Sequence, residues 1–161
     1  MKSVLLALWM TLFSVVAFAQ DFATRFMAEH QQDANLSCIT ISPTMMNKIL
    51  KSDAAEKDEQ MAEMISNLKS MQLLTSKTRV QRYYREALKV IDKNSDRFEP
   101  YLSFKGKLEE CKMMVRRRKG TIIEMVMLTK NKHQFSVINL TGIMSDDFIS
   151  QLAGALKQKH S

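Results

Sequence analysis

Glu124 is the ionisable residue whose position in this sequence most suggests a chemical role. It lies inside the apolar run TIIEMVML, which has the pattern of a buried strand. An ionised carboxylate in such a strand is costly unless it is paired, so we expect an Arg or Lys of a neighbouring element to bond to Glu124. The alternative is a functional carboxylate of raised pKa that lines a pocket.

Nucleophilic catalysis has no strong candidate. No serine lies in a G-x-S-x-G turn, and Cys111 has Glu109, Glu110 and Lys112 beside it, a setting that does not lower a thiol pKa. The other cysteine is Cys38. The two would form a disulfide only if their strands lie side by side, with Cα atoms within about 7 Å; otherwise they are buried, inert thiols. The sequence predicts no catalytic residue, and an enzyme is the less favoured interpretation.

Metal ligands are equally sparse. His30, His133 and His160 are scattered, without a second ligand at i+3 or i+4 and without zinc spacings of the H-E-x-x-H or C-x-x-C kind. The 13 methionines raise the alternative of a Cu(I) site built from thioethers. Most of them fall at core positions of periodic segments, where Met is a flexible filler. We therefore expect no metal and no other cofactor.

The densest positive run is Arg116, Arg117, Arg118 and Lys119, which leads into a turn at Lys119 and Gly120. A solvated hairpin tip of this charge discourages edge-to-edge pairing of strands. The functional alternative is a tip that contacts anionic headgroups or a polyanionic partner. The net charge of +7 at pH 7 favours encounters with anionic surfaces without identifying one.

The N-terminus has the pattern of a secretory signal peptide. Lys2 supplies the charged region, residues 4–18 the apolar region, and an A-x-A site ends at Ala19, so we expect cleavage between Ala19 and Gln20. The apolar run is shorter than the roughly 20 residues of a spanning helix, and no cysteine near the junction can carry a lipid. Residues 20–161 are therefore predicted to be one exported domain, periplasmic or secreted, with neither transmembrane span nor lipid anchor, and nucleic acid is not an expected partner.

The elements that would position these residues begin with a clear helix at 78–94. Its apolar residues recur with a 3.6-residue period, and Arg79, Arg82, Arg85 and Lys89 lie outside the apolar stripe. Weaker patterns predict further helices at 21–30, from Pro43, at 61–68 and from Ser145, and strands at 37–41 and 70–75.

The second half of the chain has the pattern of a meander. Segments 98–104, 111–117, 121–128 and 135–140 alternate like strands, and two of their three junctions have hairpin length. Segment 121–128 is apolar on both faces and should lie centrally, whereas Pro100 places its strand at an edge. With 161 residues, 45% hydrophobic and 25% charged, we expect an α+β two-layer sandwich, a mainly antiparallel sheet of five or six strands with helices on one face.

Four segments of the sequence resemble one family, DUF4252, an exported bacterial domain family. They are CITISPTMMNKIL, LKSMQLLTS, FEPYLSFK and GTIIEMVMLTKNKHQFSVINLTGIMSDDFISQL. The resemblance covers most of residues 21–158 and implies a small signal-bearing or lipid-anchored protein of Gram-negative bacteria, although this chain lacks the lipid-attachment cysteine. The family has no assigned function, so the resemblance implies no catalytic or binding residue.

These observations favour a non-enzymatic binding or structural module of the cell envelope. Its contact would be the exposed sheet face or the basic hairpin, and its partner an envelope protein or an anionic surface. The alternative is an envelope enzyme or a carrier of a small ligand or copper, with a pocket around Glu124.

Overall fold

The computed structural model describes residues 21–52 and 59–159. Along the chain the elements are α2 (Phe22–Glu29), β1 (Ser37–Ile41), α3 (Pro43–Ser52), α4 (Glu59–Ser66), β2 (Leu68–Ser76), α5 (Val80–Asp92), β3 (Glu99–Lys105), β4 (Glu109–Arg118), β5 (Thr121–Asn131), β6 (Phe135–Met144) and α6 (Asp146–Lys159). None of the helices within these ranges is long and apolar enough to cross a membrane.

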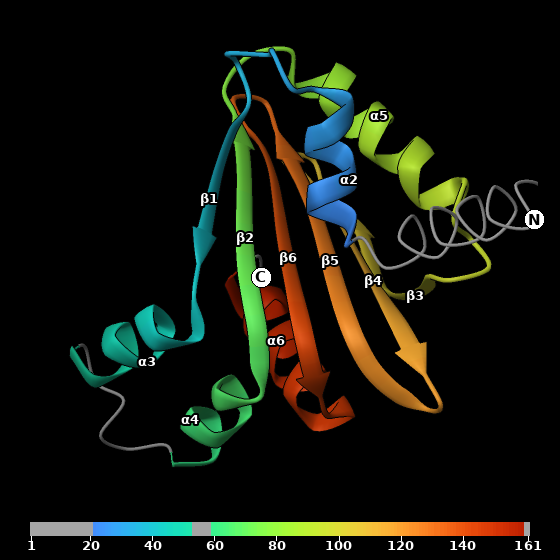
Figure 1. Cartoon of the computed structure of the whole chain (residues 1–161). Helices are drawn as coiled ribbons and strands as arrows, with labels where there is room; N and C mark the ends of the chain where they lie inside the picture. Colours follow the sequence, from blue (N-terminus) through green and yellow to red (C-terminus); the bar gives the residue numbers. More distant parts are fainter. Residues whose placement is uncertain (1–20, 53–58, 160–161) are drawn as a thin grey trace, which may run out of the picture.

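The strands form one six-stranded sheet in the order β1-β2-β6-β5-β4-β3 (Figure 1). Every neighbouring pair is antiparallel. The last four strands make the predicted meander, and β2 pairs with its far end, against β6. β5 lies inside the sheet and β3, which carries Pro100, lies at an edge. The α+β class and the antiparallel six-stranded sheet are therefore confirmed.

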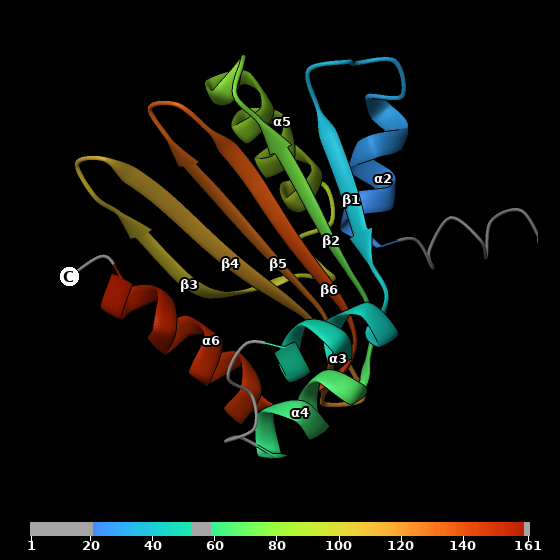
Figure 2. The same ribbon diagram turned by 90° about the vertical axis from the view of Figure 1, so that its left-hand side faces the viewer.

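The helices lie on both faces of the sheet, which corrects the expectation that they gather on one (Figure 2). Helices α2 and α5 pack on one face, over a cluster that includes Val126 and Leu128 of β5. On the other face α6 packs over a cluster that includes Met125 and Met127. Because β5 is apolar on both sides, both sides need a covering layer, and the sheet is the middle of three layers.

Helix α5 follows directly from its apolar period. Its buried side chains are Tyr83, Tyr84, Ala87, Val90 and Ile91, and the helix packs against β5 and β6. The helix begins at Val80, two residues after the predicted start, because Arg79 adopts a left-handed conformation with φ of 50°. Within the helix Arg82, Arg85 and Lys89 are exposed, away from the buried stripe.

Strand β6 does not end at the predicted residue 140, because it runs on through Gly142 to Met144. The backbone of β6 passes very close to the start of β2, where Ile143 N donates to Asn67 O at 3.1 Å. A Cβ at Gly142 would lie 2.5 Å from that same Asn67 oxygen, and the φ of Gly142 is +132°. Only glycine fits both the conformation and the space.

Candidate functional site

Glu124 lies on β5 with 0% of its surface exposed. Arg116 faces it across the β4–β5 pairing and donates from Nε to Glu124 Oε2 at 2.7 Å. The other carboxylate oxygen, Oε1, accepts from the backbone N–H of Phe22 at 2.6 Å and from Asn139 Nδ2 at 3.1 Å. A buried charge with this set of donors is paired and hydrogen-bonded, which is what its burial requires.

Asn139 on β6 extends the same network to helix α2. Its Oδ1 accepts from Ala23 N at 2.9 Å, while Nδ2 donates to Glu124 and to Met125 O. Asp21 Oδ1 caps the helix by accepting from Thr24 N at 2.7 Å. The free amides at the start of α2 therefore meet three side-chain acceptors, and the positive end of the helix faces the Glu124 charge. This arrangement holds a helix in place and leaves no oxygen of the Glu124 carboxylate without a partner.

The cysteines do not meet, so the disulfide considered from the sequence is excluded within one molecule. Cys38 lies on β1 and Cys111 on β4, with β2, β6 and β5 between them. At a strand spacing of about 4.8 Å this separates them far beyond the roughly 7 Å that a disulfide allows. Their side chains also join the clusters on opposite faces of the sheet. Both are free thiols.

Neither thiol is poised as a nucleophile. Burial, with a smaller effect of Glu109, raises the pKa of Cys111 to about 11. Burial and the Asp21 charge also raise the pKa of Cys38. At neutral pH both are held as thiols, the unreactive form.

The basic hairpin does not act as a single cationic tip. Arg116 is committed to Glu124, and Arg117 pairs with Glu99 at 2.6 Å and with Asp146 at 2.5 Å. The hydrogen bonds that Arg117 donates to Asp146 and Glu99 raise the pKa of Arg117. Arg118 and Lys119 alone of the four are exposed, and Lys119 and Gly120 form the turn with positive φ, as two-residue hairpins prefer.

Histidine and methionine side chains have structural surroundings. His30 contacts Phe26 O through Nδ1 and Glu86 through Nε2, each at 2.8 Å, so α2 is tied to α5. His133 lies in the β5–β6 turn, and His160 is outside the described residues. Met113, Met114, Met125 and Met127 are buried in the two apolar clusters. Within residues 21–52 and 59–159 no group of three or more His, Cys, Asp or Glu residues is placed to hold a metal.

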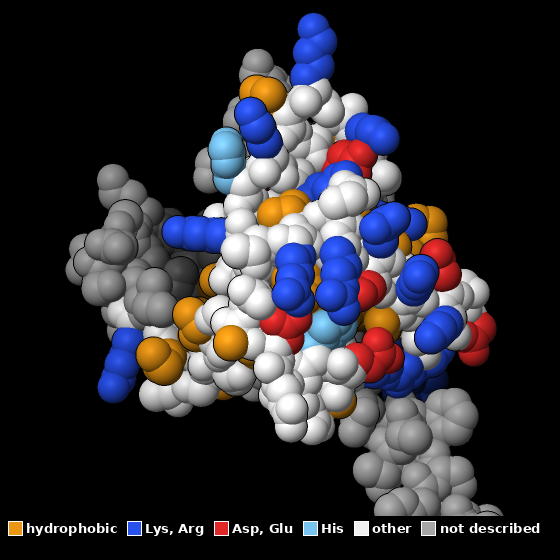
Figure 3. Space-filling model, turned by 90° about the horizontal axis from the view of Figure 1, so that it is seen from above, with side chains coloured by type: hydrophobic (Ala, Val, Ile, Leu, Met, Phe, Trp, Pro, Cys, Tyr) orange, Lys and Arg blue, Asp and Glu red, His pale blue; other side chains and the backbone are white. Residues whose placement is uncertain are grey.

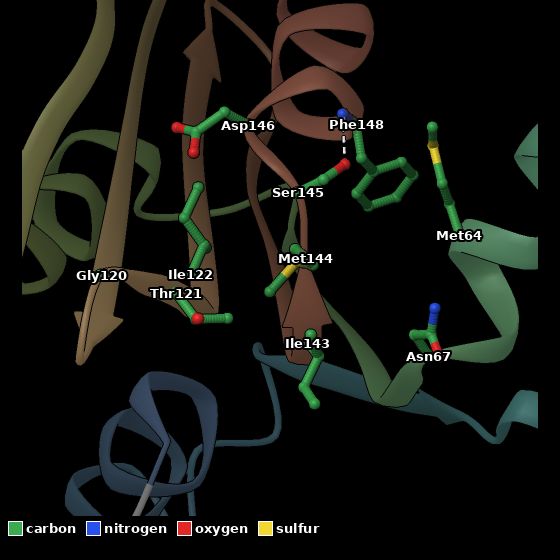
Figure 4. A pocket seen from close by; sticks show the side chains of 10 residues that line it. All are labelled: Met64, Asn67, Gly120, Thr121, Ile122, Ile143, Met144, Ser145, Asp146 and Phe148. Atoms are coloured by element: carbon green, nitrogen blue, oxygen red, sulfur yellow. Dashed lines mark hydrogen bonds between the residues drawn. The ribbon is translucent and has the colours of Figure 1, made fainter.

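A hollow of about 360 Å³ opens where β6 ends, between the β4–β5 hairpin, α4 and the start of α6 (Figure 4). Its apolar lining includes Met64, Ile122 and Phe148. Two of the polar groups beside them are already engaged, because Ser145 Oγ caps α6 by accepting from Phe148 N at 3.1 Å and Asp146 is held by Arg117. Glu124 does not line this hollow.

A second hollow, of about 510 Å³, lies at the opposite end of the sheet and was not predicted from the sequence. We call it the lysine groove, because Lys105, Lys107, Lys130 and Lys132 line it. Seen from this end, Lys and Arg side chains are spread over the surface with fewer acidic ones between them (Figure 3). Lys107 and Lys132 lie in two separate turns, β3–β4 and β5–β6, and Lys105 and Lys130 lie at the adjoining ends of β3 and β5. No continuous run of basic residues in the sequence therefore predicts the groove.

The groove combines neutralised and free charges. Glu110 pairs with Lys105 at 2.8 Å and with Lys130 at 3.0 Å, and these lysines lower the pKa of Glu110, Lys105 foremost. Lys107 and Lys132 are exposed and make no ion pair with any residue of the described chain. Leu108, which directly follows Lys107 in the β3–β4 turn, is 85% exposed. The groove therefore offers free cations next to an apolar tip.

Comparison with known proteins gives one match. The model of DUF4252, described as a domain of unknown function, matches residues 30–152. No curated protein matches the chain. The match includes Arg116, Glu124 and Asn139, whereas α2, which they hold, precedes it.

Proposed function

We propose a function from the surface of this chain itself, because the chain belongs to the DUF4252 family, which is described as a domain of unknown function. The protein is an exported, non-enzymatic module of the cell envelope that binds anionic lipid headgroups through the lysine groove. The observation that carries this proposal is the exposed Leu108, which follows Lys107 in the chain and lines the same groove as Lys107 and Lys132.

A charged bilayer surface matches both components of the groove. Anionic headgroups attract nearby lysines by about 1 kcal/mol each, and an exposed leucine gains by entering the apolar boundary below them. In water, the 85% exposure of Leu108 leaves most of an apolar side chain without packing contacts. At a membrane interface the lysines would contact headgroups and Leu108 would contact the apolar boundary below them.

Removal of the predicted signal peptide is compatible with the contacts of α2. Asp21, the residue that caps α2, lies two positions after the predicted cleavage site at Ala19. Loss of the signal peptide would leave the hydrogen bonds of Phe22, Ala23 and Thr24 intact. N-terminal sequencing of the protein purified from its exporting cell should therefore give Gln20 first, and a chain that begins at Met1 would contradict export.

The alternative of an enzyme or carrier centred on Glu124 has less support. A general acid or base needs an oxygen that can reach a substrate, whereas both oxygens of Glu124 are taken by Arg116, Phe22 and Asn139. At the hairpin, Arg118 and Lys119 stay candidates for an anion contact, and the experiment below separates them from the groove.

The test is flotation of the protein purified after export with vesicles of phosphatidylcholine, with or without phosphatidylglycerol. Wild type should float only with the anionic vesicles, and less as salt increases. K107E/K132E should weaken binding by at least about 30-fold, because each lost lysine contact removes about 1 kcal/mol and each new glutamate is repelled by the anionic headgroups. L108S should weaken it without changing the salt dependence, since no charge is altered.

The matched control is the double reversal R118E/K119E at the opposite hairpin, which changes the net charge equally. It should bind nearly as wild type does. Equal losses from both double variants would mean that net charge alone drives binding. A loss confined to R118E/K119E would transfer the site to the hairpin and refute the groove.

A further inference from the structure

The two edges of the sheet differ in how they are protected. β3 ends the sheet on one side and carries Pro100, which has no N–H to donate. Its pairing with β4 also shifts register between Pro100 and Leu102, and Glu99 and Lys105 stand at its two ends. Proline, irregular register and charge are the features that keep an edge strand from pairing with another chain.

β1, at the other edge, has none of these features. Its sequence SCITI contains no charge and no proline, and its register with β2 is continuous from Ser37 to Ile41. Among the described residues, β1 pairs with β2 alone. It is the outermost strand on its side of the sheet (Figures 1 and 2), so its outward N–H and C=O groups have no strand beside them.

Apolar side chains accompany this open edge. Ile39, at the centre of β1, is 54% exposed, and so is Met45 in the first turn of α3, directly after the strand. Large apolar side chains are thus exposed next to unpaired backbone groups. A strand that adds to the edge would satisfy the backbone and cover Ile39 together.

We propose that β1 is the docking edge for a second copy of this chain, paired antiparallel about a two-fold axis at Ile39. The axis places Ile39 against Ile39 of the second copy, Cys38 against Thr40, and Ser37 against Ile41. Every pair is uncharged, so the strands meet without the repulsion that the net charge of +7 would cause elsewhere. The pairing continues the antiparallel order and joins two six-stranded sheets.

The expected dimer is weak. A five-residue pairing buries less than the roughly 800 Å² per partner of a standard stable interface. A monomer–dimer equilibrium in the micromolar range or weaker follows, and a covalent trap is the sharpest way to detect it. The lysine groove lies outside β1, so this proposal and the proposed function can fail separately.

The trap is Thr40→Cys, which uses the natural Cys38. In the proposed register Cys38 of one copy faces the introduced thiol of the other, with Cα atoms about 4.5–5.5 Å apart, inside the range that a disulfide needs. Mild oxidation should convert T40C into a dimer linked twice, visible without reductant on a denaturing gel. Cys111 is buried on β4 and does not compete.

Two controls fix the edge and the register. C38S/T40C should stay unlinked, because its two introduced thiols, one in each copy, lie on a diagonal of about 7–8 Å, too far for a disulfide. S103C, which places a thiol on the exposed side of β3, should also stay unlinked. Ile39→Lys in the T40C background should abolish linkage by placing two charges together. Folded T40C that remains monomeric after oxidation, or linkage in C38S/T40C equal to that in T40C, would overturn the proposal.

Discussion

Asn139 on β6 donates from Nδ2 to Glu124 Oε1 on β5 at 3.1 Å. The two side chains also accept the first two backbone N–H groups of helix α2, Glu124 from Phe22 and Asn139 from Ala23. Both side chains are completely buried. They form a polar network within an apolar layer. Its hydrogen bonds are complete only when Arg116, the helix and both strands are in place. Buried networks of this kind favour one arrangement over its competitors, because each incomplete version leaves a polar group unpaired.

Glu124→Gln should therefore destabilise the fold. The substitution keeps the shape of the side chain but leaves the Arg116 guanidinium without its counter-charge in a largely buried place. We expect a loss of about 3 kcal/mol in the free energy of unfolding, measured by urea denaturation. The control is Glu99→Gln, which removes an exposed partner of Arg117 and should change stability by less than about 1 kcal/mol. Equal losses of stability in the two variants would contradict a stabilising role for the buried Glu124 network.

Gly142→Ala should be at least as damaging as the loss of the Glu124 charge. The new Cβ would meet the backbone of Asn67 at 2.5 Å, at a φ of +132°, and backbone cannot rotate away as a side chain can. We expect a loss of about 3 kcal/mol or more from clash and strain together. Gly154→Ala in α6 is the matched control, because a Cβ at this position would meet nothing within 4 Å. This substitution should stabilise the helix by about 0.5–1 kcal/mol. Thermal unfolding of both variants tests the contrast.

The two thiols should differ in reactivity. Cys111 is 2% exposed and its pKa is raised to about 11 by burial, whereas Cys38 is half-buried at the edge of the sheet. At about pH 8 a disulfide reagent should modify Cys38 first and reach Cys111 only on the timescale of unfolding. C38S should remove the faster phase. A fast phase that survives in C38S would place Cys111 nearer the surface than the structure does.

Tyr83 controls the ionisation of Asp33. The hydrogen bond from the Tyr83 hydroxyl, followed by those of Asn35, lowers the pKa of Asp33 from its ordinary 3.8 to about 2. A carboxyl whose pKa is lowered by folding stabilises the protein above pH 3.8, and that contribution is lost as the pH falls towards 2. Tyr83→Phe should raise the pKa of Asp33 towards 3.8, followed by NMR titration. An unchanged pKa would mean that Asn35 and Arg79 suffice.

Local patterns predicted the individual elements well. The 78–94 helix became α5 (Val80–Asp92), and the four meander segments became β3 to β6, with the turn at Lys119 and Gly120 as expected. These elements depend on periodicity and turn chemistry between residues near in sequence. The apolar residues on both faces of β5 also indicate a covering layer on each side of the sheet. The prediction of helices on one face overlooked this.

Local sequence patterns do not predict which residues far apart in the chain come into contact. That Glu124 needs a cationic neighbour follows from burial cost, but its bond to Phe22 spans 102 residues and no local pattern encodes it. The lysine groove joins two turns, and each of them alone has the composition of an ordinary solvated loop. The separation of Cys38 and Cys111 depends on strand order, which alternation does not specify.

The bond from Phe22 to Glu124 has a consequence for the order of assembly. A chain that emerges N-terminus first presents α2 early, yet the acceptors for its amides lie 102 and 116 residues later. This early helix is therefore among the last to be seated, after the final hairpin of the meander has closed. Until that moment the first two amides of α2 lack their side-chain acceptors.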